Sequence, residues 1–224
     1  MIASVPLERM RKRILLADDH AMMLEGLARL LAEEFEIVGT AADGRALVTM
    51  AEQLQPDVIV LDIAMPELNG IEAARQLTRV VPSAKLIFVT QRLDPAYVHA
   101  AFTAGAKAYV AKQSASKELI EAIHRALRDH FYVTPLVGEK AIELVELDPT
   151  KNPSEFFGST LTPRQREVLQ LVAEGKTSKE ISTILHISPK TVEFHRNSLM
   201  DELGVRSTAE LTRYAISRGI VSEG

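Results

Sequence analysis

The sequence predicts an α/β domain with a parallel sheet, followed by a small all-α domain of the helix-turn-helix type. Two observations predict this division. Over the first 130 residues, short apolar runs typical of buried strands alternate with stretches whose apolar residues have helical spacing. After residue 160 only helical spacing remains. A chain of 224 residues also fits two domains of ordinary size.

The α/β part contains five predicted strands. We expect them at residues 13–17, 37–39, 58–61, 86–89 and 108–111. A helical pattern follows each strand, at residues 20–33, 46–54, 71–80, 95–104 and 118–128. Strands that alternate with helices form a parallel sheet covered on both faces, because crossover connections are right-handed.

The third predicted strand stands out, because its apolar run ends directly at a carboxylate. Residues 58–61 are Val-Ile-Val-Leu, and Asp62 follows. Met65-Pro66 then forces a loop before the next helical pattern begins. Asp62 should therefore lie at the carboxyl end of a central strand, which is the edge where open α/β sheets bind ligands.

Between residues 132 and 158 the pattern weakens, and prolines interrupt it. We expect a linker here, with a short amphipathic helix near residues 142–147. The predicted organisation is an N-terminal extension at 1–10, an α/β domain at 11–131, the linker at 132–158 and the all-α domain at 159–224.

Four short helices are predicted in the all-α domain. The first begins at Pro163, and Ser178 is expected to cap the second. Pro189 opens the third, which Gly204 ends, and the fourth covers residues 208–217. A helix, a tight turn and a second helix suggest a DNA-binding domain.

Composition limits the compartment and the kind of chemistry. The chain has no cysteine, which excludes disulfides and thiolate metal sites and favours a reducing compartment. No stretch resembles a signal peptide or is long enough to span a bilayer, so we expect a cytoplasmic protein without a membrane partner. Residues 159–224 contain nine Lys and Arg against eight Asp and Glu, whereas the preceding residues contain 17 against 22. Only the C-terminal part is not acidic.

Polar side chains follow four of the predicted strands. Asp18 and Asp19 follow the first, Asp62 the third, Thr90 the fourth and Lys112 the fifth. The carboxyl ends of parallel strands meet at one edge, so we expect these groups to converge. Mg²⁺ is a natural neutraliser for converging carboxylates, and a carboxylate beside it can accept a phosphoryl group. Thr90 and Lys112 would contact the phosphoryl oxygens.

These motifs resemble the receiver domain of two-component response regulators. The resemblance covers residues 11–130 and rests on Asp18-Asp19, on LDIAMP around Asp62, on IFVT ending at Thr90 and on AYVAK ending at Lys112. It implies a five-stranded parallel sheet with strand order 2-1-3-4-5.

The same resemblance implies roles for single residues. Asp62 would be the phosphoacceptor and Asp19 a direct ligand of Mg²⁺, while Asp18 would hold that ion through water. The backbone carbonyl of Ala64 would complete the metal site. Tyr109 matches the switch aromatic of the family, whose rotamer follows the movement of the strand-end threonine.

Two positions depart from the family pattern. Gln91 follows Thr90 where a small residue is usual, which affects access to a phosphoryl group. Gln113 follows Lys112 where many receivers have proline, so we expect this loop to differ.

The all-α domain resembles the LuxR-type helix-turn-helix, and the two domains together resemble the NarL/FixJ subfamily. The motif is LTPRQREVLQLVAEGKTSKEISTILHISPKTVEFHRNSLMDELGV. Candidate DNA contacts lie at the start and on the exposed side of the third helix and on the second helix, where they would reach phosphates or base edges. They are Lys179, Ser188, Lys190, Thr191, Val192, Glu193, His195, Arg196 and Asn197.

Together these features predict a transcriptional regulator that a sensor histidine kinase phosphorylates on Asp62 with Mg²⁺, and not an enzyme. Its expected partners are double-stranded DNA, the kinase and a second copy of the chain, with RNA polymerase as a further candidate. The last helix, with Leu211 and Tyr214, is the dimer face that the resemblance implies. We expect the resting receiver to contact the DNA-binding domain or to hide that face.

Three alternatives stay open at this point. The first domain could answer to a protein or a ligand instead of phosphorylation, which Gln91 would allow. It could be an Asp-nucleophile phosphatase, although that group needs a second aspartate where this chain has Ala64. The second domain, with a net charge of only +1, could be a helical interaction module.

Overall fold

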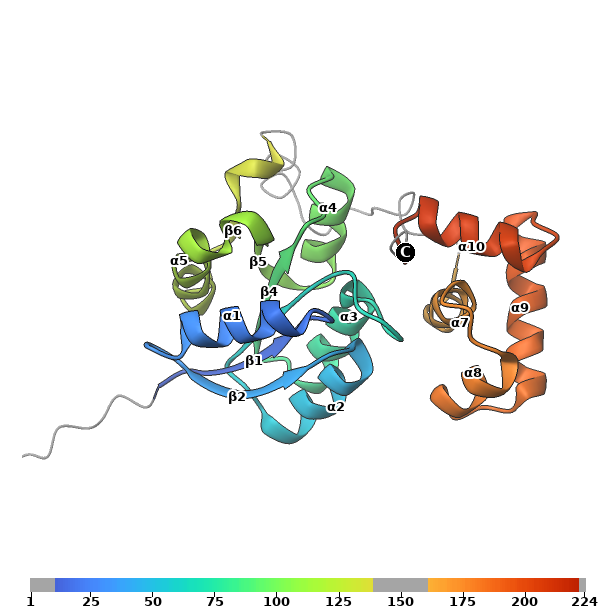
Figure 1. The fold of residues 1–224 in the computed structure, drawn as a ribbon, viewed down its shortest axis with the longest axis horizontal. Coiled ribbons are helices and arrows are strands. Elements are labelled where there is room, and N and C mark those ends of the chain that lie inside the picture. Colours follow the sequence, from blue (N-terminus) through green and yellow to red (C-terminus); the bar gives the residue numbers. More distant parts are fainter. Residues whose placement is uncertain (1–10, 139–160, 222–224) are drawn as a thin grey trace, which may run out of the picture.

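The computed structural model describes residues 11–138 and 161–221 (Figure 1). It confirms a parallel α/β domain followed by a helical domain. The strands are β1 (Arg13–Ala17), β2 (Glu36–Ala41), β3 (Val58–Leu61), β4 (Lys85–Thr90), β5 (Ala106–Ala111) and β6 (Tyr132–Val133). The first domain's α-helices are α1 (Ala21–Leu31), α2 (Gly44–Leu54), α3 (Gly70–Val80), α4 (Pro95–Thr103) and α5 (Ala115–Leu127). Short 3₁₀ turns occupy Lys112–Ser114 and Pro135–Val137.

The sheet has the strand order β2-β1-β3-β4-β5-β6, and every neighbouring pair is parallel. The predicted order of the first five strands is therefore confirmed, and β3 lies at the centre beside β1 and β4. All four residues of β3 are buried, as their apolar, β-branched composition predicts.

The sixth strand differs from the expected five and lies where the linker was predicted to begin. Tyr132 and Val133 pair with Ala108 and Tyr109 of β5. The next amide, of Thr134, donates a hydrogen bond to the Tyr109 carbonyl at 2.8 Å. Two residues are too short to show an alternating pattern, and a proline follows at residue 135. A strand that covers the β5 edge is therefore not predicted here.

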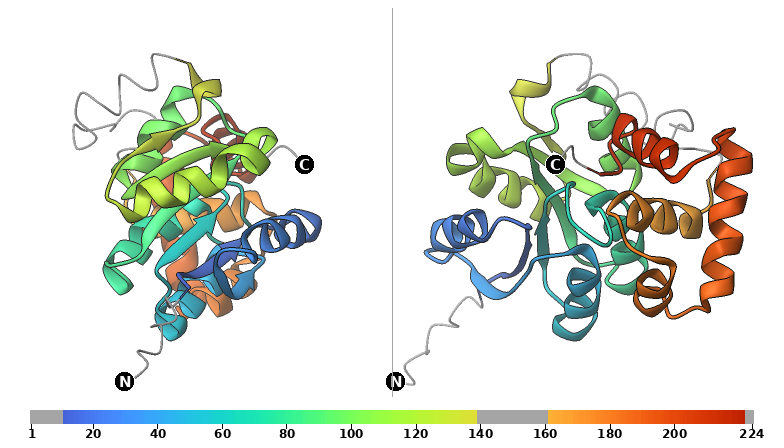
Figure 2. Two further views of the ribbon diagram at one scale, coloured as in Figure 1. Left: turned by 90° about the vertical axis from the view of Figure 1, so that its left-hand side faces the viewer. Right: turned by 45° about the vertical axis from the view of Figure 1, so that its right-hand side comes forward.

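Helices cover both faces of the sheet (Figure 2). Helices α1 and α5 bury one apolar face, through residues such as Leu31 and Ile123. Helices α2, α3 and α4 cover the other, through residues such as Leu47, Leu77 and Val98. With right-handed crossover connections, the helices of this domain cover the two faces of the sheet and leave the carboxyl ends of its strands free of helix.

Capping side chains set several helix starts. Asp43, Asn69 and Asp94 accept hydrogen bonds from the first backbone amides of α2, α3 and α4. In the second domain the prediction that Ser178 caps a helix is wrong by one residue. Thr177 is the cap, because its side chain and that of Glu180 bond reciprocally to each other's backbone amides.

The second domain consists of α7 (Pro163–Ala173), α8 (Ser178–Ile184), α9 (Pro189–Leu203) and α10 (Thr208–Ser217). They share a separate apolar core that includes Leu169, Ile181, Leu199 and Leu211. Figures 1 and 2 both show α7 on the side nearer the sheet and α9 on the outer side of this domain.

Two expectations fall on other parts of the chain. The N-terminal extension at residues 1–10 and the linker helix near residues 142–147 lie outside the described residues. Among the residues that are described, none of the helices has the length and apolar character needed to cross a membrane.

Alanine substitutions at two glycines test how closely the loop after β3 packs against the start of α2. A Cβ at Gly44 would lie 1.8 Å from the Leu68 carbonyl oxygen, whereas a Cβ at Gly26, inside α1, would meet nothing within 4 Å. We expect Gly44→Ala to lower the free energy of unfolding by about 1–3 kcal/mol through overpacking. Gly26→Ala should raise it by about 0.5–1 kcal/mol, since alanine loses less backbone entropy in a helix. Urea unfolding followed by circular dichroism measures both, and equal effects would contradict the packing.

Candidate functional site

Four strand ends bring their polar side chains together at one edge of the sheet. Lys112, just after β5, reaches across the edge, and its Nζ lies 2.7 Å from Asp18 Oδ2 and 2.7 Å from Asp62 Oδ2. The side chains of these three residues are at most 5% exposed, and Thr90 is also buried. One ammonium group therefore bridges two buried carboxylates.

This bridge is reflected in the titration of the lysine. Burial alone lowers the pKa of Lys112, but its hydrogen bonds to Asp18 and Asp62 and their charges outweigh burial and raise the pKa above its usual value. The ammonium is therefore charged at neutral pH, and it compensates carboxylates that would otherwise repel each other.

Asp19 lies beside the bridge together with a residue that the sequence reasoning missed. His20 Nδ1 lies 2.7 Å from Asp19 Oδ1 and 3.1 Å from Asp18 Oδ1. The charge of Asp19 and the hydrogen bond to Asp18 raise the pKa of His20. One potential ligand atom from each of these three residues lies within 4.8 Å of the others. The only sequence signal for His20 is its position directly after the two aspartates.

The backbone after Asp62 folds back on the carboxylate. The Ile63 amide donates to Asp62 Oδ1 at 2.6 Å, and the Gly70 amide donates to the Ile63 carbonyl at 2.8 Å. A Cβ at Gly70 would lie 2.0 Å from the Asp62 carbonyl oxygen, so this turn requires glycine. Ala64 lies within the turn.

A cleft of about 630 Å³ opens over Asp62 and is shared by the two domains. The first domain lines it with Asp62, Ala64, Thr90 and Lys112, among others. Ile216 of α10 and Val221, from the second domain, line it as well. The site thus lies under apolar residues of the helical domain.

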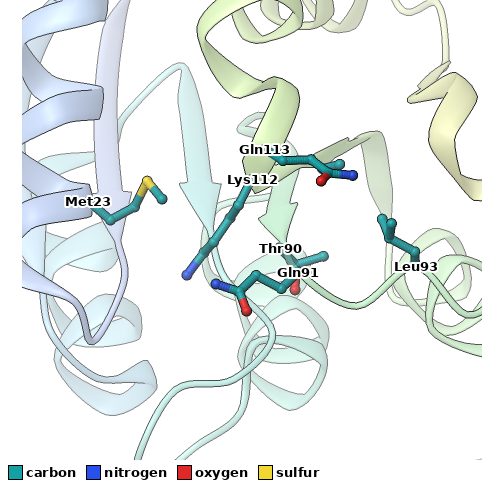
Figure 3. Close-up of a pocket in the computed structure, with 7 residues that line it drawn as sticks. Met23, Thr90, Gln91, Leu93, Lys112 and Gln113 are labelled. Atoms are coloured by element: carbon teal, nitrogen blue, oxygen red, sulfur yellow. The ribbon is translucent and has the colours of Figure 1, made fainter.

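A second cavity of about 450 Å³ lies on the α1 side of Lys112 and contains both departures from the family pattern (Figure 3). Figure 3 shows Lys112 extending between Met23 on one side and Thr90 with Gln91 on the other. Gln113 lines the same cavity. Gln91 therefore narrows the approach to Thr90 and Lys112.

Tyr109 is fully buried on β5 and is linked to the strand-end threonine through one residue. Its hydroxyl donates to the Arg92 carbonyl at 2.5 Å, and the Arg92 amide donates to Thr90 Oγ1 at 3.3 Å. Burial raises the pKa of Tyr109 well above its usual value. Hydrogen bonds to the backbone of Arg92 thus connect Thr90 and Tyr109.

The start of α9 carries several of the predicted DNA contacts on an exposed surface. Ser188 caps the helix by accepting from the Thr191 amide at 3.0 Å, and the hydroxyls of these two residues lie 2.8 Å apart. Lys190 is exposed beside them, and Lys179 is exposed on α8. Amide, hydroxyl and ammonium donors therefore lie together near one helix start.

Other predicted contacts on α9 are occupied within the domain. Arg196 donates to Ser178 Oγ at 3.1 Å, to Glu193 Oε1 at 3.3 Å and to Thr208 Oγ1 at 3.0 Å, and Glu193 also accepts from Ser178. Arg196 thus joins α8, α9 and α10.

The remaining positions on α9 differ in exposure. Val192 is buried in the helical core, while Asn197 is exposed. His195 is half-buried against the exposed ring of Phe194, an aromatic residue that the sequence reasoning did not single out. Burial, then the charge of Arg164, lowers the pKa of His195.

Comparison with known proteins places both halves of the chain. Residues 14–124 match the response regulator receiver domain, and residues 159–215 match the bacterial regulatory proteins of the luxR family. The chain is 36% identical over 212 residues to the transcriptional regulatory protein LiaR of Bacillus subtilis, covering 94% of this chain and 99% of LiaR.

Solved structures are similar over nearly the whole chain as well. RcsB from Salmonella enterica serovar Typhimurium, bound to a promoter in the presence of the phosphomimetic BeF₃⁻, is 27% identical with a TM-score of 0.59 and covers 92% of this chain and 99% of its own. A structure of two RcsB dimers bound to two parallel DNAs is 28% identical with a TM-score of 0.54. The match covers 92% of this chain and 98% of the RcsB chain.

Replacing the bridging lysine tests the electrostatics of this site. We expect Lys112→Ala to lower the free energy of unfolding by about 3 kcal/mol in buffer containing EDTA, because two buried carboxylates lose their partner. Lys12→Ala removes an exposed lysine that pairs with Asp57 at 2.6 Å and should cost less than about 1 kcal/mol. Urea unfolding of both variants gives the comparison. A smaller loss for Lys112→Ala than for Lys12→Ala would contradict the buried bridge.

Proposed function

The chain belongs to the two-component response regulators that join a receiver domain to a LuxR-type DNA-binding domain, and we propose that a histidine kinase phosphorylates it on Asp62 to control its binding to DNA. The observation that carries this proposal is the convergence of Asp18, Asp62, Thr90 and Lys112 at one sheet edge. In this function a carboxylate oxygen of Asp62 attacks the phosphorus of a phosphohistidine. The new O–P bond forms as the P–N bond breaks, and the imidazole leaves with the electron pair.

The neighbouring side chains suit the transferred group. Lys112 Nζ already lies at hydrogen-bond distance from Asp62, so it can contact a phosphoryl oxygen there with little movement. Thr90 lines the same cleft and offers a hydroxyl donor. Positioning and charge compensation are most of what phosphoryl transfer requires from a protein.

The donor set also fits a Mg²⁺ ion, because hard oxygen ligands are what this ion prefers. We propose that Asp19 and Asp62 hold it directly, that Asp18 holds it through water and that the Ala64 carbonyl completes the set. When bound, the ion would neutralise charge on the phosphoryl oxygens. The proximity of Asp18 to Asp19 and the lining of the cleft by Ala64 support this assignment.

The gating proposal connects Asp62 to the DNA-binding domain. Phosphorylation adds nearly two negative charges, and the residues across the cleft belong to α10 and the segment after it. Helix α10 is the dimer face that the family resemblance implies, and Tyr214 lies on it half-buried. We propose that the unphosphorylated receiver holds α10, that Tyr109 and Thr90 change together on phosphorylation, and that release permits dimerisation on DNA.

We propose two kinds of contact with DNA, one to phosphates and one to base edges. The donors at the start of α9, which are Ser188, Lys190 and Thr191, would hold phosphates together with Lys179. Asn197 would reach base edges in the major groove. Glu193 and Arg196 reach DNA only if they give up their present partners.

The remaining assignments follow from this function. We propose a cytoplasmic regulator and not an enzyme, with double-stranded DNA, a sensor kinase and a second copy of the chain as partners, and with RNA polymerase as a further partner at promoters. Control by a protein or ligand at an unphosphorylated receiver is the second candidate, favoured by Gln91 in the cavity beside Lys112. Ala64 continues to disfavour a phosphatase.

The gating proposal predicts that Asp62→Ala abolishes two responses to acetyl phosphate: dimerisation, measured by light scattering, and the gain in affinity for DNA selected by the phosphorylated protein. Both responses require the phosphoryl group. Glu52→Ala removes an exposed carboxylate from α2 and should leave both responses intact. If dimerisation and the affinity gain persisted in Asp62→Ala, the gating proposal would fail.

The metal assignment predicts that EDTA prevents labelling of the wild-type chain by acetyl phosphate and that Mg²⁺ restores it. Asp19→Asn should raise the Mg²⁺ concentration for half-maximal labelling by about tenfold or more, because one carboxylate ligand becomes neutral. Phos-tag gel migration reports both results. Labelling without any divalent cation would contradict the assignment, and no labelling under any condition would favour control by a protein or ligand.

A further inference from the structure

The loop that leaves the phosphorylation site is held by side chains of the other domain. Three backbone groups between Asp62 and α3 bond to residues at the C-terminal end of α7: the Met65 carbonyl, the Glu67 amide and the Asn69 amide. These groups all follow Ala64 in the chain, between it and the start of α3. The position of this loop is therefore set partly from outside the receiver.

Gln170 makes most of these bonds. Its Oε1 accepts from the Asn69 amide at 2.8 Å and from Asn69 Nδ2 at 3.2 Å, and its Nε2 donates to the Met65 carbonyl at 3.0 Å. Only 1% of the residue is exposed. A buried amide whose oxygen and nitrogen are both used fixes its partners in one arrangement, because a lost bond would leave polar groups unpaired away from water.

Glu174 supplies the third bond and a charge. Its Oε1 accepts from the Glu67 amide at 3.0 Å and from Gln170 Nε2 at 2.8 Å. Glu67 has φ +62°, a left-handed conformation that is costly for a residue with a side chain. Burial raises the pKa of Glu174, and its two hydrogen bonds partly offset this.

Ion pairs on the same face of α7 support the contact. Arg166 Nε lies 2.6 Å from Glu72 Oε1, and Arg45 Nη2 lies 3.2 Å from Glu167 Oε2. Three of these four side chains are no more than 11% exposed, and Arg45 is 24% exposed. The loop contacts thus belong to a wider polar interface between α7 and helices α2 and α3.

Glu174 lies in a groove beside the phosphorylation site. It lines this groove of about 470 Å³ together with Asp19, Ala64 and apolar residues of α10 and the segment after it. A phosphoryl group on Asp62 would add negative charge to an edge that already carries Asp19 and Glu174. The arrangement held by α7 therefore favours the unphosphorylated state, in which this edge carries less negative charge.

We propose that Gln170 and Glu174 are positioning residues of the phosphorylation site, contributed by the DNA-binding domain, and that they restrain the loop of residues 63–69 in the arrangement that disfavours phosphoryl transfer to Asp62. We call the contact of these two side chains with the loop the clamp. This rests on the proposed function. Because coupling between two equilibria is reciprocal, a clamp that phosphorylation opens must itself disfavour the phosphorylated state, and DNA that binds the open form must favour that state. We expect the clamp to slow labelling as well, because the loop must leave its present arrangement to receive the phosphoryl group.

The clamp does not act by covering the DNA-binding surface of α9. Figures 1 and 2 show α9 on the outer side of its domain, away from the sheet. The clamp acts on the receiver loop through α7, and the start of α9 stays exposed.

The test uses two glutamines of the same helix in the full-length chain. Gln170→Met keeps the size of the side chain and removes its bonds to the loop. Gln165→Met is the matched control, because Gln165 is also buried on α7 but its side chain donates to Ser198 and Glu202 within the second domain. The probe is acetyl phosphate with Mg²⁺. Asp62 gains the phosphoryl group and acetate leaves.

We expect Gln170→Met to speed labelling about fivefold or more on a Phos-tag gel, a coupling of ordinary size. Hydrogen exchange of the peptide containing residues 63–69 should quicken in the same variant. Gln165→Met should leave both unchanged. Glu174→Ala should also speed labelling, and Glu174→Gln, which keeps an acceptor for the Glu67 amide, should lie nearer to wild type. These two variants provide the test if Gln170→Met does not fold.

The outcomes separate the clamp from the function on which it rests. If the wild-type chain is labelled but Gln170→Met and Glu174→Ala are labelled at the wild-type rate or more slowly, the clamp is wrong and the proposed function stands. If Gln165→Met speeds labelling as much as Gln170→Met, the effect is general loosening of α7 and the clamp is again wrong. If the wild-type chain is not labelled at all, the proposed function itself fails.

Discussion

The structure depends on one electrostatic constraint: three carboxylates lie at the carboxyl edge of a parallel sheet, and one buried ammonium compensates two of them. Asp18 and Asp62 must lie at this edge because they follow β1 and β3, which are neighbours, and Lys112 reaches them from the end of β5. Such a cluster loses stability when a buried charge loses its partner. It therefore responds to whatever changes the balance of its charges, which is the property that a phosphorylation site needs.

The same edge explains why the two domains lie where they do. The turn after Asp62 must be tight, since Gly70 leaves no room for a side chain against the Asp62 carbonyl. The rest of the loop then projects backbone groups outward, and α7 meets them with Gln170 and Glu174. Residues of the second domain also cover the cleft over Asp62. Charge at the sheet edge and contact with the DNA-binding domain are consequently parts of one arrangement.

Most of the first domain followed from local patterns. The apolar run before Asp62 and the polar residues at the other strand ends were enough to predict the sheet and the convergence of the site. β6 is not predictable because two residues carry no periodicity. The cap lies at Thr177 and not at Ser178 because Glu180 completes a capping box with Thr177. No sequence pattern predicts the role of Gln170, because a glutamine on a helix is normally a surface residue unless the loop that faces it is known. Contacts between domains depend on tertiary structure, which sequence spacing does not contain.

The buried carboxylate at the end of β3 is the proposed acceptor of the phosphoryl group. Reductive trapping identifies the acceptor, because borohydride converts an aspartyl phosphate into homoserine, and peptide mass spectrometry then locates the converted residue. After treatment of the wild-type chain with acetyl phosphate and Mg²⁺, we expect conversion at Asp62 and at no other aspartate. Conversion at Asp18 or Asp19, or stable labelling with Asp62 unconverted, would contradict it.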